Sequence, residues 1–443
     1  MLFRAYSYTS FHFPPRTRMQ RKLIALALAS LSGAALAQSN NVNIYGTLHG
    51  NFDVISVSGG TGAAAANTPT FNRVTSTSSL LGFKGKENLG NGLAAIFQYE
   101  VAMNLDAGGG NSLFGTARNS FVGLESNDLG TFKLGNFEGP TRAFESEIDL
   151  SVNGYGPGTN GGIDSARAVV GKMGGLLKGS SGSLGTQSAP STTRSGSTAS
   201  PFDIYYANAV SWASPKISGF QAIALYATSE NKDELAASRI NTSLYDLGLS
   251  YDNGPVRLSL TNAAIRLRNQ DDGTAAVGTL SERWGDNFRS NETRFGARYK
   301  FSAASVGFLW SHNRTKADAN ALAGRIAATN GLDLKQNVWG INGTYNVTDH
   351  SRVIAQAFRA EDISGSLGNG TNPLADTGAR FYTFGYEHSL SKRTLLRAVY
   401  AHLKNDTNAG KWNGGYDFGN SGTGFAGPER TLAGLQMGLR HTF

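Results

Sequence analysis

The chain has 443 residues, with 40 Lys and Arg against 32 Asp and Glu, a formal net charge of +8 and no cysteine. The lack of cysteine excludes a disulfide scaffold, a thiolate metal site and a cysteine nucleophile. Only 16% of the residues are charged and 40% are apolar, which excludes a coiled coil, a basic nucleic-acid-binding tail and an acidic disordered chain.

The first predicted element is an export signal over residues 1–37. Arg21-Lys22 precede the apolar run 23–31, and Ala35-Leu36-Ala37 places small residues at a cleavage site before Gln38. This is the tripartite layout of a secretory signal. The apolar run is too short for a transmembrane helix, which needs about 20 residues. We therefore expect cleavage between Ala37 and Gln38; a buried N-terminal helix is the alternative.

Removal of this signal changes the charge balance. The five basic residues before Gln38 are accompanied by no acidic residue, so the mature part, 38–443, carries 35 basic and 32 acidic residues and a net charge of +3. The basic character of the chain is therefore weak evidence for an anionic partner. A complete signal already begins at Met19, so Met1 and Met19 are alternative starts, and residues 1–18 would be a mis-assigned extension in the second case.

Apolar and polar residues alternate along much of the mature chain, for example over 42–54, 292–301 and 433–443. A period of two is typical of β-strands with one apolar and one polar face. No run of 18 apolar residues follows Ala37, so the sequence contains no candidate transmembrane helix. With the apolar face toward lipid, Phe295→Arg should harm folding far more than Arg294→Ala.

Short turns alternate with long loops along the chain. Turn signals lie at 87–92, 127–130, 214–216, 252–255, 302–304, 348–350 and 389–392, and Gly/Ser/Asn/Asp-rich segments lie near 55–77, 104–117, 136–203, 229–242, 268–289, 316–333, 363–377 and 405–429. The pattern predicts an all-β fold, a 16-stranded antiparallel transmembrane β-barrel with short periplasmic turns and long extracellular loops. Strand edges in lipid must be paired, so the barrel closes, and sixteen strands can hold water. A soluble β-sandwich is the alternative.

Aromatic residues recur near the predicted strand ends, where a girdle at the membrane interface is expected. These residues are Phe97, Tyr99, Phe121, Phe132, Trp212, Phe220, Tyr251, Tyr299, Phe301, Tyr345 and Tyr386.

Four segments carry a family likeness: 38–46, 79–98, 118–136 and 438–443. They resemble Gram-negative general porins of the trimeric neisserial and burkholderial type, strongly over 38–135 and 431–443 and weakly elsewhere. The resemblance implies an outer-membrane general diffusion porin, a homotrimer whose water-filled channels pass ions and small hydrophilic solutes. It further implies contacts with membrane lipid and lipopolysaccharide and folding by the barrel-assembly machinery. No cofactor, metal or nucleic acid is expected.

The resemblance also assigns candidate site residues. Loop 3, at about 136–203, is expected to fold into the barrel and constrict it. Its basic wall would consist of Arg118, Lys84, Lys86, Lys133 and Arg142, and strand parity also directs Lys84 and Lys86 into the lumen. The opposing acidic side would consist of Glu138, Glu145, Glu147 and Asp149. Charges placed in this way select ions. The terminal Phe443 would serve as an assembly signal.

Some residues depart from the family pattern. Related porins often carry arginine at the positions of Leu80, Asn136 and Tyr206, and its absence argues against strong anion selectivity. The segment 174–200 is rich in Gly, Ser and Thr and resembles a flexible linker, which would narrow the lumen, cover it or lie outside it.

Other functions remain open. An enzyme is not expected, because the seven histidines are scattered and neither HExxH nor a P-loop is present. A substrate-specific channel for sugars or organic anions would line its lumen with aromatic residues, for which Phe114, Tyr155 and Tyr416 are candidates. A surface adhesin barrel is the third possibility. Ion selectivity and the solute size limit are left undetermined by these patterns.

Overall fold

The computed structural model describes residues 42–60, 67–106, 114–148, 202, 205–228, 238–271, 288–317, 332–366, 373–409, 416–418 and 427–443. The predicted signal with its cleavage site at Ala37 and Gln38 lies outside these residues, as do Asp149 and most of the predicted loop 3.

The described part of the chain is built almost entirely of β-strands that belong to one sheet. The strands are β1 (Asn43–Gly59), β2 (Thr70–Ser76), β3 (Leu80–Gly90), β4 (Leu93–Met103), β5 (Phe114–Ala117), β6 (Ser120–Ser126), β7 (Gly130–Glu138), β8 (Tyr205–Ala213), β9 (Phe220–Thr228), β10 (Ser238–Asn253), β11 (Val256–Asp271), β12 (Phe288–Lys300), β13 (Ala304–Ala317), β14 (Leu332–Thr348), β15 (Ser351–Ala360), β16 (Ser364–Ser366), β17 (Ala379–Ser389), β18 (Thr394–Asn405) and β19 (Arg430–Thr442). The helix α2 (Pro140–Ile148) follows β7.

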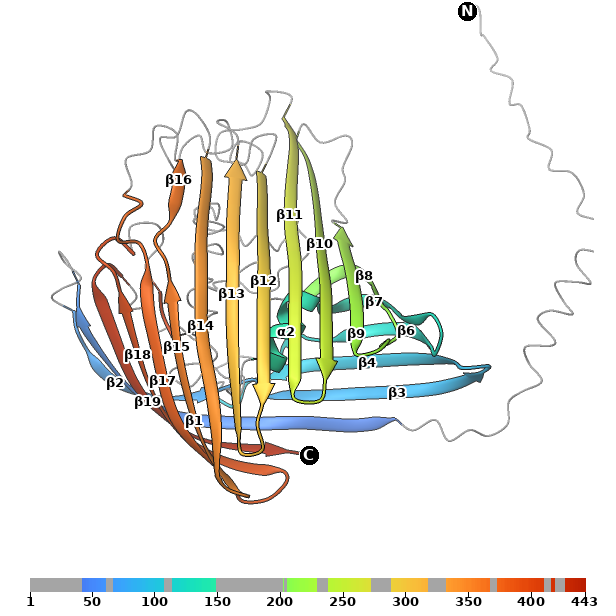
Figure 1. Cartoon of the computed structure of the whole chain (residues 1–443), viewed down its shortest axis with the longest axis horizontal. Helices are drawn as coiled ribbons and strands as arrows, with labels where there is room; N and C mark the ends of the chain where they lie inside the picture. The colour runs from blue at the N-terminus through green and yellow to red at the C-terminus, as the bar shows by residue number, and fades with distance from the viewer. Residues whose placement is uncertain are drawn as a thin grey trace, which may run out of the picture. The chain divides into compact units, whose positions relative to one another are not determined.

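Three short strands continue a neighbour and add no further position to the wall. β2 and β3 pair with successive parts of β1, β5 and β6 with successive parts of β4, and β15 and β16 with successive parts of β14. The described wall therefore has sixteen antiparallel strands, and β1 pairs with β19 to close it (Figure 1). The predicted 16-stranded antiparallel barrel is confirmed.

The two ends of the barrel chain meet at this closure. The N–H of Gly46 donates to the carbonyl of Phe443 at 3.1 Å, and the N–H of Phe443 donates to the carbonyl of Gly46 at 3.0 Å. A Cβ at position 46 would lie 2.4 Å from Cζ of Phe443, so only glycine lets the terminal ring pack over β1. Because both partners lie at strand ends, these bonds leave little of the seam unpaired.

All seven predicted turns join two strands, and the eight remaining connections fall at the predicted loops. The turn between β3 and β4 has positive φ at Asn91 (50°) and Gly92 (75°), as tight hairpins require. The predicted loop bounds were too wide, because β1 continues to Gly59 and β2 begins at Thr70, inside the predicted loop 55–77. Cross-strand pairing, including the 3.0 Å ion pair of Arg73 with Asp53, overrides the loop-like composition there.

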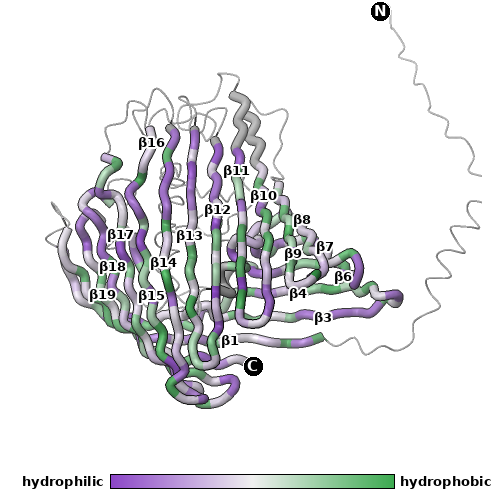
Figure 2. The backbone as a smooth tube through the Cα atoms, in the orientation of Figure 1, coloured by the Kyte–Doolittle hydropathy of each residue, from purple (hydrophilic) through white to green (hydrophobic). Residues whose placement is uncertain are grey.

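The alternating pattern sorts the side chains onto two faces. On β1, Ile44 and Phe52 are 63% and 42% exposed, whereas His49 and Asp53 are 1% and 0% exposed. Polar residues therefore face inward and apolar residues outward, and the two colours alternate along the strands in Figure 2. Most of the predicted girdle residues face outward, but Phe121 does not: it turns inward and packs edge-on against Phe137, with ring centres 6.0 Å apart.

The helix α2 lies on the inner face of the sheet, in contact with β9 through β13 (Figure 1). It is the first part of the predicted loop 3 and enters the barrel directly after β7. No helix in the described ranges is long and apolar enough to cross a membrane.

Candidate functional site

A buried carboxylate fastens α2 to the inner wall. Asp246, on β10, accepts a hydrogen bond from the N–H of Thr141 at 3.1 Å and from its hydroxyl at 2.6 Å. Thr141 is in the first turn of the helix, where backbone N–H groups have no partner within the helix. The carboxylate supplies that partner and lies at the positive end of the helix dipole. Loop 3 is thereby held against β10 where it begins.

An ion pair on β12 completes this attachment. The guanidinium of Arg294 donates to the carbonyl of Thr141 at 3.0 Å and pairs with Glu292, which also accepts from the hydroxyl of Ser311 at 2.8 Å. All of these side chains are buried. Gly248 admits the helix, since a Cβ there would lie 2.5 Å from Cβ of Pro140. Arg294 is thus part of a buried network, which the alternation of polar and apolar residues did not predict.

A second group of charges surrounds the ring of Tyr205 on β8. The guanidinium carbons of Arg118 and Arg142 lie 5.2 and 5.1 Å from the ring centre, within the range of cation–π attraction. Arg118 also pairs with Glu100 at 2.5 Å, and Arg142 pairs with Glu138 at 3.2 Å. These contacts fix both guanidinium groups in place, because each is held by a ring and by a carboxylate.

The same network extends along the wall to Lys84. The hydroxyl of Tyr45 donates to Glu100 at 3.0 Å and accepts from the amide of Gln98 at 2.8 Å. The ammonium of Lys84 lies 5.0 Å from the centre of the Tyr45 ring. Side chains from β1, β3, β4, β8 and α2 therefore form one continuous polar and aromatic network.

The remaining predicted cations occupy different surroundings. Lys133, on β7, lies 4.9 Å from the ring centre of Phe121 and 5.1 Å from that of Phe137. Lys86 pairs with Glu125 at 2.6 Å, and both side chains are exposed near the short turns. We call Lys84, Arg118, Lys133 and Arg142 the basic wall, and Lys86 lies apart from it.

The predicted acidic residues do not all face the basic wall. Glu138 lies within it, paired with Arg142, so it does not supply an opposing acidic side. Glu145 and Glu147 belong to α2, but their side chains are outside the described part, and Asp149 is outside the described residues. One departure from the family pattern has a structural role, because the amide of Asn136 donates to the carbonyl of Arg118 at 2.6 Å and so holds its backbone.

The sequence analysis missed a further group of arginines on the inner wall. Arg352 on β15 pairs with Glu387 on β17 at 2.6 Å, and Arg397 on β18 lies 3.8 Å from the same carboxylate. Strand pairing puts Arg440 of β19 on the same face. Alternation around Leu396 and Met437 is the signal in the sequence that could have indicated these arginines, because both residues face outward.

Two of the three candidates for an aromatic track, Tyr416 and Phe114, lie in the described part of the chain and have different surroundings. Tyr416 is fully buried, where it accepts from the amide of Gln336 at 2.8 Å and donates to the carbonyl of Thr377 at 3.3 Å. Burial raises the pKa of this phenol, which keeps it protonated as a donor. Phe114 is exposed at the start of β5, and Tyr155 lies outside the described residues. Tyr416 thus anchors a loop.

The comparisons with known proteins agree with this architecture. The family of Gram-negative porins matches residues 23–408. Outer membrane porin protein 32 of Delftia acidovorans is 28% identical, covering 96% of this chain and 100% of that protein. The major outer membrane protein P.IB of Neisseria meningitidis serogroup B is 36% identical, covering 30% of this chain and 41% of that protein.

Among solved structures, an anion-selective porin from Comamonas acidovorans has a TM-score of 0.63 at 24% identity, covering 91% of this chain and all of that one. The trimer form of OmpT from Vibrio cholerae has a TM-score of 0.57 at 15% identity, covering 92% of this chain and all of that one. With its closed barrel, polar interior and apolar exterior, the chain belongs to the Gram-negative porin family and is an outer-membrane channel for ions and small hydrophilic solutes.

Proposed function

We propose that the basic wall is the selective part of the channel and favours small anions over cations. The observation that carries this proposal is that the guanidinium groups of Arg118 and Arg142 lie 5.2 and 5.1 Å from the centre of the same Tyr205 ring. An aromatic ring holds a guanidinium in place without neutralising its charge, whereas a second carboxylate would neutralise it. The two arginines therefore keep a fixed orientation and contribute positive potential to the lumen.

The charge balance of the wall supports the same preference. Among the side chains that the structure describes, its four cations meet two carboxylates, those of Glu100 and Glu138. Lys84 and Lys133 lie over aromatic rings, so the cluster keeps an excess of positive charge. A cleft with charge of one sign and low-dielectric walls concentrates counter-ions. The Comamonas acidovorans porin is described as anion-selective, and we propose the same preference here from this chain's own residues.

Loop 3 would supply the opposite side of the constriction. In this proposal Glu145, Glu147 and Asp149, which follow Arg142 in loop 3, face the three other cations of the basic wall, Lys84, Arg118 and Lys133, across the lumen and create a transverse field. The attachment of Thr141 to Asp246 supports a loop that stays inside the barrel.

The proposed function also includes the export, folding and oligomeric assembly of the protein. We infer that the protein is exported with cleavage before Gln38, is folded by the barrel-assembly machinery with Phe443 as its signal, and forms homotrimers in contact with lipopolysaccharide. The hydrogen bonds of Phe443 across the seam and the trimeric form described for OmpT of Vibrio cholerae support this proposal. N-terminal sequencing of the membrane-extracted protein tests the cleavage site.

The selectivity is tested by the reversal potential of single channels across a KCl gradient. We expect the wild type to prefer chloride, and the double variant Arg118→Gln with Arg142→Gln to lower the chloride-to-potassium permeability ratio several-fold. Lys86→Gln, outside the basic wall, is the matched control. An unchanged reversal potential in the double variant would remove the two arginines from the selective site.

Block of the current by low sugar concentrations would favour a substrate-specific channel, and negligible conductance would favour an adhesin.

A further inference from the structure

Three polar, uncharged side chains lie side by side on neighbouring strands of the wall, β14, β15 and β17. Strand pairing puts Asn342 opposite Gln356 and Gln356 opposite Thr383. All three are enclosed, since they are 4%, 5% and 4% exposed. We call them the amide row. Side chains at opposed positions of paired strands are close enough to interact, so the row is one continuous polar surface.

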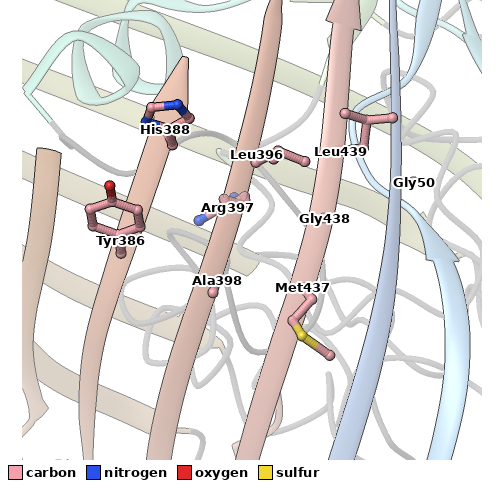
Figure 3. Close-up of a pocket in the computed structure, with 9 residues that line it drawn as sticks. All are labelled: Gly50, Tyr386, His388, Leu396, Arg397, Ala398, Met437, Gly438 and Leu439. Atoms are coloured by element: carbon pink, nitrogen blue, oxygen red, sulfur yellow. The ribbon is translucent and has the colours of Figure 1, made fainter. Parts of the chain in front are cut away.

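The amide row belongs to the inner face of the barrel. Tyr386 of β17, labelled in Figure 3, is 44% exposed on the outer face, and Thr383 is three residues away from it. Because faces alternate along a strand, Thr383 points to the lumen side. Likewise Ile341 is 54% exposed, and the next residue, Asn342, faces inward. The row is therefore part of the wall along which solutes pass.

The polar atoms of the row have no partner within the described part of the chain. Oδ1 and Nδ2 of Asn342, Oε1 and Nε2 of Gln356 and Oγ1 of Thr383 are all buried there without a hydrogen bond. By contrast, Gln221 on the inner face of β9 donates to the carbonyl of Ser214 at 3.2 Å. Enclosed polar groups are nearly always hydrogen-bonded, and water or a bound molecule supplies the partner where the protein does not.

Apolar side chains border the row on the same face. Ile354 and Phe358 are the inward residues on either side of Gln356, and Phe381 is the inward residue next to Thr383; all three are buried. Small-molecule sites typically combine such an apolar lining with a few polar groups that fix the orientation of the ligand.

The nearest charges do not belong to the row. On the same face of β15 and β17, Arg352 and Glu387 lie four residues from it and pair with each other at 2.6 Å. On β13, Gly307 separates Asn342 from Arg298 of β12. An ion at the row would therefore meet no counter-charge there, whereas a neutral solute loses nothing by that.

We propose that the amide row binds an uncharged polyhydroxyl solute, of the carbohydrate class, on its way through the channel. Each amide offers a donor and an acceptor side by side, and a hydroxyl group both donates and accepts. Solute hydroxyls donate to the carbonyl oxygens of Asn342 and Gln356 and accept from their amide nitrogens, and the apolar face of the solute packs against Phe358. This site goes beyond the ion preference proposed for the basic wall and uses none of its residues.

The site is tested with maltose by isothermal titration calorimetry of the purified mature protein in an amine-oxide detergent, which carries no sugar. The double variant Asn342→Leu with Gln356→Met keeps the volume and removes the polar groups, and we expect maltose to bind it roughly tenfold more weakly, as the loss of one or two net hydrogen bonds predicts. Gln221→Met, the same kind of change elsewhere on the inner face, is the matched control and should bind maltose like the wild type.

A second readout separates binding from a structural role. The removed amides have no partner within the described chain, so the double variant should unfold in urea at the same or a higher concentration than the wild type. Its chloride-to-potassium permeability ratio should also be unchanged, and Arg118→Gln with Arg142→Gln should keep full maltose binding. The ion preference and this site can therefore fail independently.

We expect binding at millimolar maltose, because neutral hydrogen bonds compete with water, so the low concentrations that block a substrate-specific channel leave the row mostly unoccupied. Equal maltose affinity in the double variant and the wild type overturns the proposal. No maltose binding by the wild type also overturns it and leaves the row to ordered water alone. Tighter binding of the neutral amide N-acetylglycinamide than of maltose overturns the assignment to carbohydrates.

Discussion

Two groups of charged residues on the inner wall, the one behind α2 and the basic wall, differ in what balances their charges. Behind α2, Asp246, Glu292 and Arg294 are buried and are satisfied by one another and by the backbone and hydroxyl of Thr141. In the basic wall, aromatic faces hold several of the cations, and the described cations outnumber the described carboxylates. A buried charge must be paired, because desolvation is costly, whereas a charge that water reaches can stay unbalanced. The first region therefore attaches loop 3 to the wall, and the second is the one that we propose as the selective site.

The largest effect is expected where a buried ion pair is broken. Arg294→Met leaves the carboxylate of Glu292 buried without its cation, and we expect the free energy of unfolding to fall by about 3–5 kcal/mol. Urea unfolding of the protein in detergent or bilayers measures this change. The double variant Glu292→Gln with Arg294→Met should recover much of the loss.

The next residue on the strand, Phe295, faces outward, and a substitution there gives a loss of folding free energy to compare with that of Arg294→Met. Phe295→Arg places a cation on the lipid face, at a cost of about 2–4 kcal/mol at mid-bilayer. The inner and outer variants should therefore be similarly damaging, contrary to the expectation from alternation alone. A negligible effect of Arg294→Met would show that the attachment region tolerates an unpaired charge as the basic wall does.

A smaller loss is expected at the helix attachment itself. Asp246→Ala removes the acceptor for the N–H and hydroxyl of Thr141 and should lower the free energy of unfolding by about 1–3 kcal/mol. We also expect larger current fluctuations, since the start of loop 3 is released from β10. Single-channel recording measures them. Thr141→Val removes only the hydroxyl bond and should give a weaker form of the same change; quiet channels in Asp246→Ala would contradict the assigned role.

In the basic wall, the ring of Tyr205 is expected to matter more for selectivity than for folding. Tyr205→Leu removes two cation–π contacts, each worth about 0.5–2 kcal/mol, and should lower the chloride-to-potassium permeability ratio because both guanidinium groups become mobile. Reversal potentials measure this ratio. Tyr205→Phe keeps the ring and should behave like the wild type, so equal losses in the two variants would point to the hydroxyl instead.

The smallest effect is expected at the exposed pair of Lys86 and Glu125. Both side chains are reached by water, so Lys86→Gln should change the free energy of unfolding by about 0–1 kcal/mol, and less at high salt. Urea unfolding at low and high KCl measures the change. A loss as large as that of Arg294→Met would mean that this pair belongs to a buried network.

The barrel architecture was predictable from the sequence because it depends on local patterns. A period of two sorted side chains such as Phe295 and Arg294 onto opposite faces, and turn residues such as Asn91-Gly92 marked the short connections. Strand number, closure and the outward apolar face follow from these patterns together with the need to pair every strand edge in lipid. The exception, Phe121, shows that aromatic character near a strand end does not by itself specify a face.

The site depended on contacts that no local pattern encodes. Thr141 meets Asp246 across 105 residues and Arg294 across 153 residues, and both contacts exist only because the closed wall brings β10 and β12 against the start of loop 3. The same closure sets Arg118 and Arg142 at one ring, that of Tyr205. On the strands that alternate cleanly, the sequence alone determined which residues line the lumen, since parity is local. Only the tertiary structure decided which of their charges meet, since that depends on the three-dimensional path of the chain.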